Sequence, residues 1–517
     1  MKIGYSFIKR NLKLISLKKH FDISPTVFYP TALVSILFVV VVLIVGKPAS
    51  IFFSNFQTLM SSNLGWMVTL IINITLITVI YFGIGNYGKL KLGGKNATPE
   101  FSTFSWVAML FSAGMGIGLL YFSVAEPMYH FNNPLSTDLN LKQKITHSMN
   151  TTFLHYGFHV WAIYCLVGLA LAYSCFNKGR PLSLGGTIVG ILPKNNTFIT
   201  RLIDSLAALA TLFGLATSLG FGARQFCSGL ESLVGLPNTP ANQVLSIVVI
   251  TIIATISIVT GLKKGVRILS NLNIILALLL FFFVLTFGPS IKLLDFFIQS
   301  TGNYLKDFIG ISFERGALDD NSSFLKGWSM FYWAWWISWS PFVGTFIARI
   351  SKGRTIREFV LFVLFIPTLV SFIWLGVFGG LAFDLQIAQN LDVAKVVAKD
   401  SSKALFFVLE TLPLSSFISG LAITLVATFF ITSSDSGSLV VDYMTSGGKL
   451  DAPNGQKIFW ASMEGAIAIA LIAGGGLSAL QAASISTGFP FAIFLLFMAY
   501  ALKKELSEEI NLKHRKN

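Results

Sequence analysis

Four of the ten tryptophans in the chain lie within seven residues, at Trp333, Trp335, Trp336 and Trp339. Positions three and four residues apart share one face of a helix, so Trp335, Trp336 and Trp339 would form a wall of indole rings. Such rings either anchor a helix at the membrane surface, where the N–H meets water, or attract a cation that cannot donate hydrogen bonds, such as a quaternary ammonium group. Because the cluster runs along two turns and ends at Pro341, the sequence favours a ligand site.

Three glycines alternate at Gly114, Gly116 and Gly118 inside another apolar run. Each would cost a regular helix about 1 kcal/mol relative to alanine. One explanation is close packing of helices through small residues. The other is an unwound stretch whose free carbonyl groups face a ligand or an ion.

Oxygen-bearing side chains follow a further apolar run at 432–438, which reads Thr-Ser-Ser-Asp-Ser-Gly-Ser. Hydroxyl and carbonyl oxygens suit Na⁺, and polar groups inside a membrane span need partners. Thr432 and Ser433 are the better candidates for ion ligands, whereas residues 434–438 could instead cap the helix at the membrane surface. His155 and His159 could bind a metal from one helix face, but no third ligand accompanies them in the sequence.

Composition places these motifs in a membrane. Apolar residues make up 54% of the 517 residues and charged residues only 12%, which predicts a polytopic membrane protein. The net charge of +15 is spread over short loops, so we exclude nucleic-acid binding. Three cysteines in apolar surroundings indicate neither a disulfide framework nor a metal site. Nucleophiles or acid pairs with the spacing of an enzyme are missing, as is the repeated polar stripe of a channel.

About twelve runs are long enough to cross a hydrocarbon core of roughly 30 Å. They lie at 27–45, 66–85, 104–125, 151–174, 203–228, 243–261, 268–288, 327–349, 359–381, 413–432, 458–474 and 480–502. Alternate loops are rich in Lys and Arg, whereas Glu231–Gln243 has no basic residue. Because cytoplasmic loops collect positive charge, we expect both termini to be cytoplasmic.

The spans at 104–125 and 327–349 are expected to be interrupted, at the glycines and near Ser340 and Pro341. They stand five spans apart, so spans 3–7 and 8–12 form two blocks that enter the membrane in opposite directions, as in secondary transporters. The predicted parts are a basic cytoplasmic segment at 1–26, two leading helices at 27–100, a first five-helix repeat at 101–290, an external amphipathic helix at 291–326, a second repeat at 327–502 and a cytoplasmic tail at 503–517.

Gly114–Leu119, Val124–Pro127 and above all Trp333–Arg357 resemble the betaine/choline/carnitine transporter family. The resemblance covers nearly the whole chain. It implies an all-α fold of twelve transmembrane helices, with two leading helices and two inverted five-helix repeats of the leucine-transporter type. It also implies a homotrimer in a bacterial plasma membrane.

The resemblance implies site residues as well. An aromatic box for a trimethylammonium group would use Trp336, Trp161 and Tyr164, with Tyr156 where sodium-coupled betaine carriers usually have tryptophan. Tyr156 is the least secure member, since it would lie about 140° around a regular helix from Trp161. Further substrate contacts fall on Trp335, Trp339, Met115 and Gly118.

For Na⁺, the resemblance implies a site formed by Ser112, Met115, Phe429, Thr432 and Ser433. A second Na⁺ site would use Thr211 and Phe342, but Leu215 stands where a hydroxyl residue is expected. Sodium-independent members carry arginine where this chain has Asn273, and choline carriers often have an acidic residue at Gly118. We therefore expect Na⁺-coupled uptake of glycine betaine or a related osmolyte. The alternative is choline or carnitine transport driven by H⁺ or by exchange.

Overall fold

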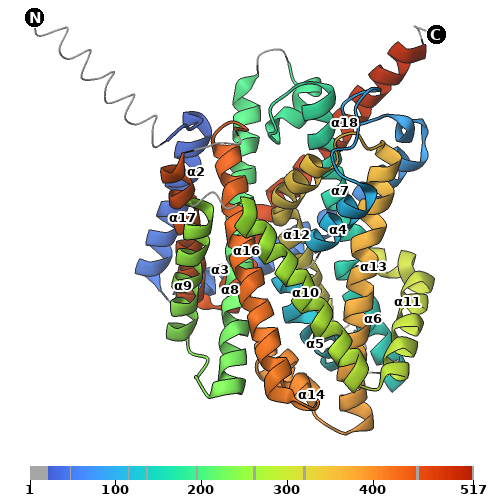
Figure 1. Cartoon of the computed structure of the whole chain (residues 1–517), viewed down its shortest axis with the longest axis vertical. Coiled ribbons are helices and arrows are strands. Elements are labelled where there is room, and N and C mark those ends of the chain that lie inside the picture. Colours follow the sequence, from blue (N-terminus) through green and yellow to red (C-terminus); the bar gives the residue numbers. More distant parts are fainter. Residues whose placement is uncertain are drawn as a thin grey trace, which may run out of the picture.

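The computed structural model describes residues 21–514, apart from 47, 115, 136–137, 194–195, 260–262, 318–321 and 450–452. Throughout these residues the regular structure is helical, with one isolated β-bridge between Lys91 and Thr355. Most of the long helices run along the longest axis of the molecule (Figure 1). The helices are α2 (Pro25–Val45), α3 (Pro48–Ile84), α4 (Thr103–Gly114), α5 (Ile117–Asn132), α6 (Leu141–Tyr156), α7 (Phe158–Ala172), α8 (Thr197–Val234), α9 (Pro240–Val259), α10 (Lys263–Phe287), α11 (Ser290–Phe313), α12 (Ser322–Ile350), α13 (Ile356–Phe383), α14 (Val393–Lys399), α15 (Ala404–Glu410), α16 (Ser415–Thr445), α17 (Asn454–Gly475) and α18 (Leu477–His514).

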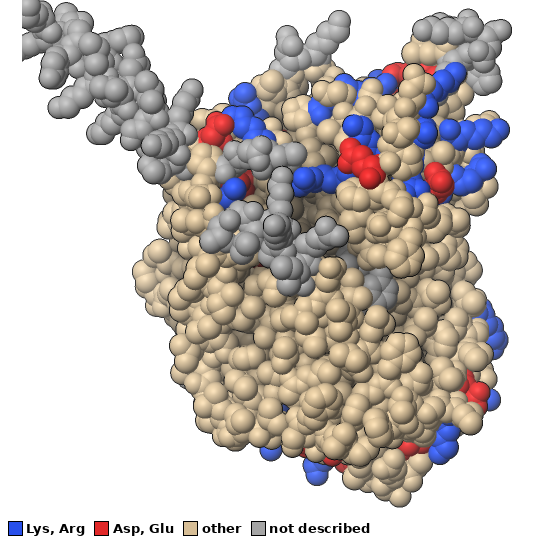
Figure 2. All heavy atoms as spheres, in the orientation of Figure 1, with Lys and Arg blue, Asp and Glu red and all other residues tan. Residues whose placement is uncertain are grey.

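Ten of the twelve expected membrane spans fall on helical stretches of the described chain that are long and apolar enough to cross a membrane. The two other expected spans, 104–125 and 327–349, are not among these ten stretches. Each predicted span falls on one helix or, for 104–125 and 151–174, on two consecutive helices. On the face shown in Figure 2, charged residues gather at the two ends and leave a broad band of other residues between them. This distribution is the one that a hydrocarbon core requires.

The loops predicted to be cytoplasmic lie together at one end of the molecule. Lys449, after α16, donates to Asp22 at 2.6 Å, and the Tyr87 hydroxyl lies 2.7 Å from that of Ser507 in α18. The carboxyl end of α18 lies at the upper end in Figure 1. Segments that are far apart in the sequence therefore lie at the same end of the molecule.

Arg224 in α8 has an ion partner. Its Nη2 atom lies 3.3 Å from Asp400 Oδ1, in the loop between α14 and α15. Nearby, Lys403 pairs with Glu231 at 2.7 Å. These pairs fasten the segment at 393–410 to the end of α8.

The glycine-rich stretch is interrupted, as predicted. Helix α4 ends at Gly114, and α5 begins at Ile117 after an extended Gly116 with φ −167° and ψ −178°. The break separates the two halves of the third predicted span and leaves the first backbone N–H groups of α5 without partners inside that helix.

The predicted break near Ser340 and Pro341 is wrong, because α12 is continuous from Ser322 to Ile350. Proline lacks the N–H that would bond to the carbonyl four residues earlier, at Ile337. The Ser340 hydroxyl donates to that carbonyl at 2.7 Å. A neighbouring side chain thus satisfies the group that the proline leaves unbonded, and the helix continues.

The structure contains a break that we did not predict, between α6 and α7 at Gly157. A Cβ atom there would lie 2.6 Å from the Phe153 carbonyl oxygen and 3.0 Å from the Tyr304 hydroxyl. Only glycine allows this approach of α6 to α11 without displacement. The junction changes the direction in which side chains on either side of it point.

The alternative that residues 434–438 cap a helix at the membrane surface is wrong, since α16 continues to Thr445. The buried Asp435 carboxylate accepts from Ser257 of α9 at 2.6 Å, and Ser438 donates to Glu464 of α17 at 2.6 Å. The polar cluster therefore joins α16 to two neighbouring helices inside the bundle.

Candidate functional site

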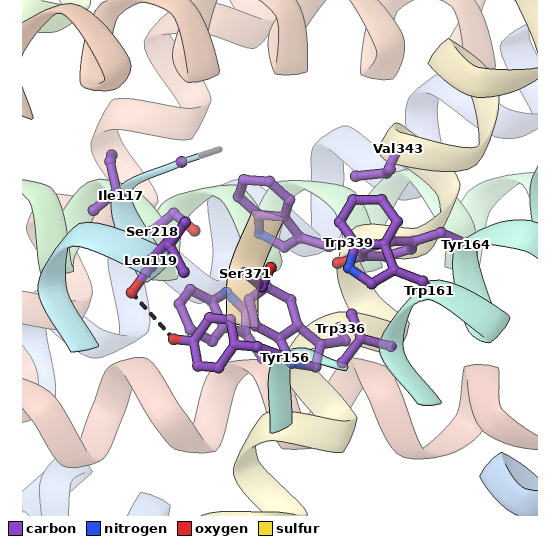
Figure 3. Close-up of a pocket in the computed structure, with 14 residues that line it drawn as sticks. Ile117, Leu119, Tyr156, Trp161, Tyr164, Ser218, Trp336, Trp339, Val343 and Ser371 are labelled. Carbon is purple, nitrogen blue, oxygen red and sulfur yellow. Dashed lines mark hydrogen bonds between the residues drawn. The ribbon is translucent and has the colours of Figure 1, made fainter. Parts of the chain in front are cut away.

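An aromatic cavity of about 50 Å³ lies between the two interrupted spans and α12 (Figure 3). Helices α5, α7, α8, α12 and α13 contribute to it, together with the last residue of α6. Its lining residues are Gly116, Ile117, Gly118, Leu119, Tyr156, Val160, Trp161, Tyr164, Ser218, Trp335, Trp336, Trp339, Val343 and Ser371. The fourteen include no Asp, Glu, Lys or Arg, so the cavity carries no formal side-chain charge.

Trp336 contacts two other residues of the predicted box. Its ring centroid lies 5.5 Å from that of Tyr156 and 6.4 Å from that of Tyr164, and both pairs are close to perpendicular, at 72° and 83°. Trp161 packs edge-on against Tyr164 at 5.3 Å. The structure thus brings all four predicted box residues, from three helices, to one cavity.

Tyr156 joins the cavity because of the break at Gly157. On an unbroken helix it would point about 140° away from Trp161, but it is the last residue of α6, whereas Trp161 belongs to α7. Its hydroxyl donates to the Gly118 carbonyl at 3.1 Å (Figure 3). The same hydroxyl lies 3.3 Å from that of Tyr332. Tyr156 therefore links α6 to the glycine break as well as presenting its ring to the cavity.

The other predicted substrate contacts are placed as follows. Trp335 stacks on Trp336 with centroids 4.7 Å apart and planes at 12°, and Trp339 lines the same cavity. A Cβ atom at Gly118 would lie 2.9 Å from the Trp335 ring, so glycine lets α5 approach α12 closely. Met115 lies outside the described residues.

Three residues of the predicted Na⁺ site, Phe429, Thr432 and Ser433, lie within about one turn of α16. The Thr432 hydroxyl accepts from the Asn273 amide at 3.0 Å. This contact places Asn273 beside the predicted site, where sodium-independent members would carry arginine. Met115 and the Ser112 side chain lie outside what the structure describes, so the complete ligand set stays a prediction.

The residues present do not fit a second Na⁺ site. Leu215 packs against Gly437, where a Cβ atom would lie 2.3 Å from a Leu215 methyl carbon. The Thr211 hydroxyl is fully buried and faces the Met444 sulfur at 4.0 Å, and Phe342 packs edge-on against Trp339 at 5.5 Å. An apolar leucine offers no oxygen ligand to a hard cation such as Na⁺.

Comparison with known proteins agrees with this geometry. The family model described as "BCCT, betaine/carnitine/choline family transporter" matches residues 26–511. The chain belongs to this family. Its members are transporters, so the prediction that the chain is a polytopic membrane transporter and not an enzyme is confirmed.

Three named relatives are 40–48% identical to the chain over the aligned residues. A glycine betaine/proline/choline transporter of Vibrio parahaemolyticus is 41% identical over 95% of this chain and 91% of its own length. A glycine betaine/proline/choline/ectoine transporter of the same organism is 48% identical over 82% of this chain and 76% of its own. A probable glycine betaine transporter of Desulfitobacterium hafniense is 40% identical, with 94% and 98% covered.

Sequence reasoning missed two polar residues of the cavity, Ser218 in α8 and Ser371 in α13. A serine within an apolar span is usually a packing residue, and neither stands in a motif. It also assigned no role to the neighbours of His155, because Glu126 and His130 follow the end of the span predicted at 104–125 and are far from His155 in the sequence. The i, i+4 spacing of Glu126 and His130 was the available signal.

Proposed function

We propose that the chain is a secondary transporter that takes up glycine betaine, or a closely related methylammonium osmolyte, together with Na⁺. The observation that supports this most is the uncharged cavity walled by Tyr156, Trp161, Tyr164 and Trp336. Ring faces attract a trimethylammonium group, by about 2 kcal/mol when it is desolvated.

The polar atoms of the cavity suit the carboxylate end of a zwitterion. The Tyr164 hydroxyl and the Trp339 indole N–H are buried and have no hydrogen-bond partner among the described residues. The amino end of α5 lies at the cavity, and the amino ends of helices attract negatively charged groups. A substrate with one positive and one negative group would use both sets of contacts.

Na⁺ would bind between the glycine break and α16, held by Phe429, Thr432 and Ser433 with Ser112 and Met115. Hydroxyl and carbonyl oxygens are the ligands that a hard cation prefers. Binding of the ion would order the backbone next to the substrate cavity, because Gly116 and Gly118 line that cavity. Asn273 lies beside Thr432 and carries no charge, so its side chain would not repel a cation bound there.

The architecture that we propose has twelve membrane-spanning segments, two leading and ten in two inverted repeats, with both termini in the cytoplasm of a bacterial cell. Rocking of one group of helices against the other would alternate access to the cavity. We propose a homotrimer in the plasma membrane and a role in osmoprotection, on the basis of family resemblance.

The decisive experiment is uptake of labelled glycine betaine by proteoliposomes that contain the purified chain. Uptake should require an inward Na⁺ gradient and should persist when an inward proton gradient is collapsed. Equal uptake with K⁺ in place of Na⁺ would rule out Na⁺ symport. Absence of betaine uptake under every gradient would rule out the substrate.

A second candidate is choline or carnitine transport by H⁺ coupling or exchange. The names of both Vibrio relatives include choline, which supports choline as the alternative substrate. Competition by unlabelled choline and carnitine in the same vesicles separates the candidates. Choline that competes better than betaine would favour the second.

A further inference from the structure

A second polar site lies next to the aromatic cavity. Glu126 and His130 are one turn apart on α5, and His155 lies near the end of α6. Glu126 Oε1 lies 2.5 Å from His155 Nδ1 and 3.2 Å from His130 Nε2. All three side chains are completely buried, with exposed fractions of 0%. Neither substrate binding nor the Na⁺ site accounts for them.

The three residues meet the requirements of a transition-metal ligand set. One ligand atom from each lies within 4.8 Å of the other two. Two imidazole nitrogens and one carboxylate oxygen are a recurring protein ligand set for Zn²⁺, with bonds of about 2.0–2.2 Å and an open fourth position. Ligand atoms around a tetrahedral ion lie about 3.3–3.6 Å apart, so Glu126 Oε1 and His155 Nδ1, now 2.5 Å apart, would separate by about 1 Å to admit the ion.

The ring nitrogen of His155 that faces away from Glu126 has a polar partner, as the corresponding nitrogen usually has in metal sites. Its Nε2 atom lies 2.9 Å from the Ser329 hydroxyl of α12. Histidines that bind a metal through one nitrogen usually donate the other N–H to a polar group, which fixes the tautomer and the ring orientation. The Tyr332 ring stacks on the imidazole with centroids 4.5 Å apart and planes at 18°. The ring of His155 is therefore held in place on two sides.

His159, which the sequence paired with His155, is not part of this cluster. Its Nε2 atom lies 3.2 Å from Asn73 Oδ1 in α3. The two residues that lie beside His155 come instead from α5, where Glu126 and His130 share one face.

We propose that Glu126, His130 and His155 form a binding site for a divalent transition metal, with Zn²⁺ as the representative ion. The ion would replace the hydrogen bonds between the imidazoles and Glu126. The ring proton of His155 would then reside on Nε2, facing Ser329, and that of His130 on Nδ1. Any additional proton shared with the carboxylate would be released to solvent.

Metal binding would fasten α5 to α6 beside the substrate cavity. The Trp336 indole N–H donates to the carbonyl of His155 at 2.8 Å, so one wall of the box is attached to a metal ligand. Because the ligands are enclosed, the ion would reach them only when the surrounding helices separate. A bound ion would then restrict the movement of α5 relative to α6.

The test measures Zn²⁺ binding to the purified full-length chain, independently of transport. The protein is equilibrated with Zn²⁺ alone and desalted, and its zinc content and X-ray absorption spectrum are recorded. One ion per chain with two imidazole nitrogens and a carboxylate oxygen is expected. H130N and E126Q should each weaken binding at least about 100-fold, and S329A by about 10-fold, as outer-shell partners usually do. H159N serves as the matched control and should bind like the unchanged chain.

Thermal unfolding with and without Zn²⁺ shows that each variant is folded. Zinc should raise the midpoint of the unchanged chain and of H159N but not of H130N. Zinc bound with the same affinity by H130N and E126Q would overturn the proposal. The proposal would also be overturned if the unchanged chain bound no zinc while its uptake showed a pH dependence that requires Glu126. The cluster would then bind only protons. Failure of betaine uptake would leave the zinc result unaffected.

Discussion

The indole N–H of Trp336 donates to the backbone carbonyl of His155 at 2.8 Å. This bond joins α12 to the last turn of α6, two residues before the break at Gly157. Because Tyr156 follows His155 directly, the same contact sets the spacing between two rings of the box, whose centroids lie 5.5 Å apart. The position of Trp336 is thus determined by a main-chain contact as well as by ring packing.

Trp336→Ala should weaken glycine betaine affinity about 30-fold, which corresponds to loss of about 2 kcal/mol of cation–π attraction. Trp336→Phe keeps a ring face but loses the bond to His155, so we expect a smaller loss. Substrate affinity is measured by titration calorimetry on the purified chain. Equal affinity for the Ala variant and the unchanged chain would remove Trp336 from the site.

Thr432→Ala should raise the Na⁺ concentration needed for half-maximal uptake about tenfold, with little change in maximal rate, because one hydroxyl ligand is removed. Thr424→Ala on the same helix is the matched control. The Thr424 hydroxyl donates to the Gly420 carbonyl on an exposed face, so its loss should leave the Na⁺ dependence unaltered. If both variants responded alike, the effect would belong to α16 as a whole.

Gly118→Asp should increase choline uptake relative to betaine uptake. The new carboxylate would add a negative charge to a cavity that has none, which favours a cation over a zwitterion. Gly118→Ala separates charge from size, because a Cβ atom would already lie 2.9 Å from the Trp335 ring. We expect the Ala variant to lose uptake of both substrates without a change in their ratio. Competition between the labelled substrates in proteoliposomes measures that ratio.

The positions of the long helices could be predicted because a membrane span is recognised from the length of a continuous apolar run, which the sequence contains directly. Prediction failed where one local contact overrides a propensity. Pro341 indicated a break, but the Ser340 hydroxyl bonds to the Ile337 carbonyl and keeps α12 continuous. Gly157 did not indicate a helix break, since a single glycine is common in membrane helices. Its role depends on Tyr304, almost 150 residues away, which no pattern within the span could reveal.

Gly157→Ala should therefore disrupt both the box and the packing of α6. The added methyl group would lie 2.6 Å from the Phe153 carbonyl oxygen and 3.0 Å from the Tyr304 hydroxyl. Because the carbonyl oxygen belongs to the backbone of α6, it can move away only if the helix itself shifts. We expect a loss of about 1–3 kcal/mol in stability, typical of overpacking, and displacement of the Tyr156 hydroxyl from Gly118. Affinity for betaine should fall with the thermal midpoint of the purified chain. Gly302→Ala in α11 is the control, because a Cβ atom there meets nothing within 4 Å and alanine is the better helix former. A Gly157→Ala variant with unchanged affinity and midpoint would show that the junction tolerates a side chain, and that the position of Tyr156 does not depend on the glycine.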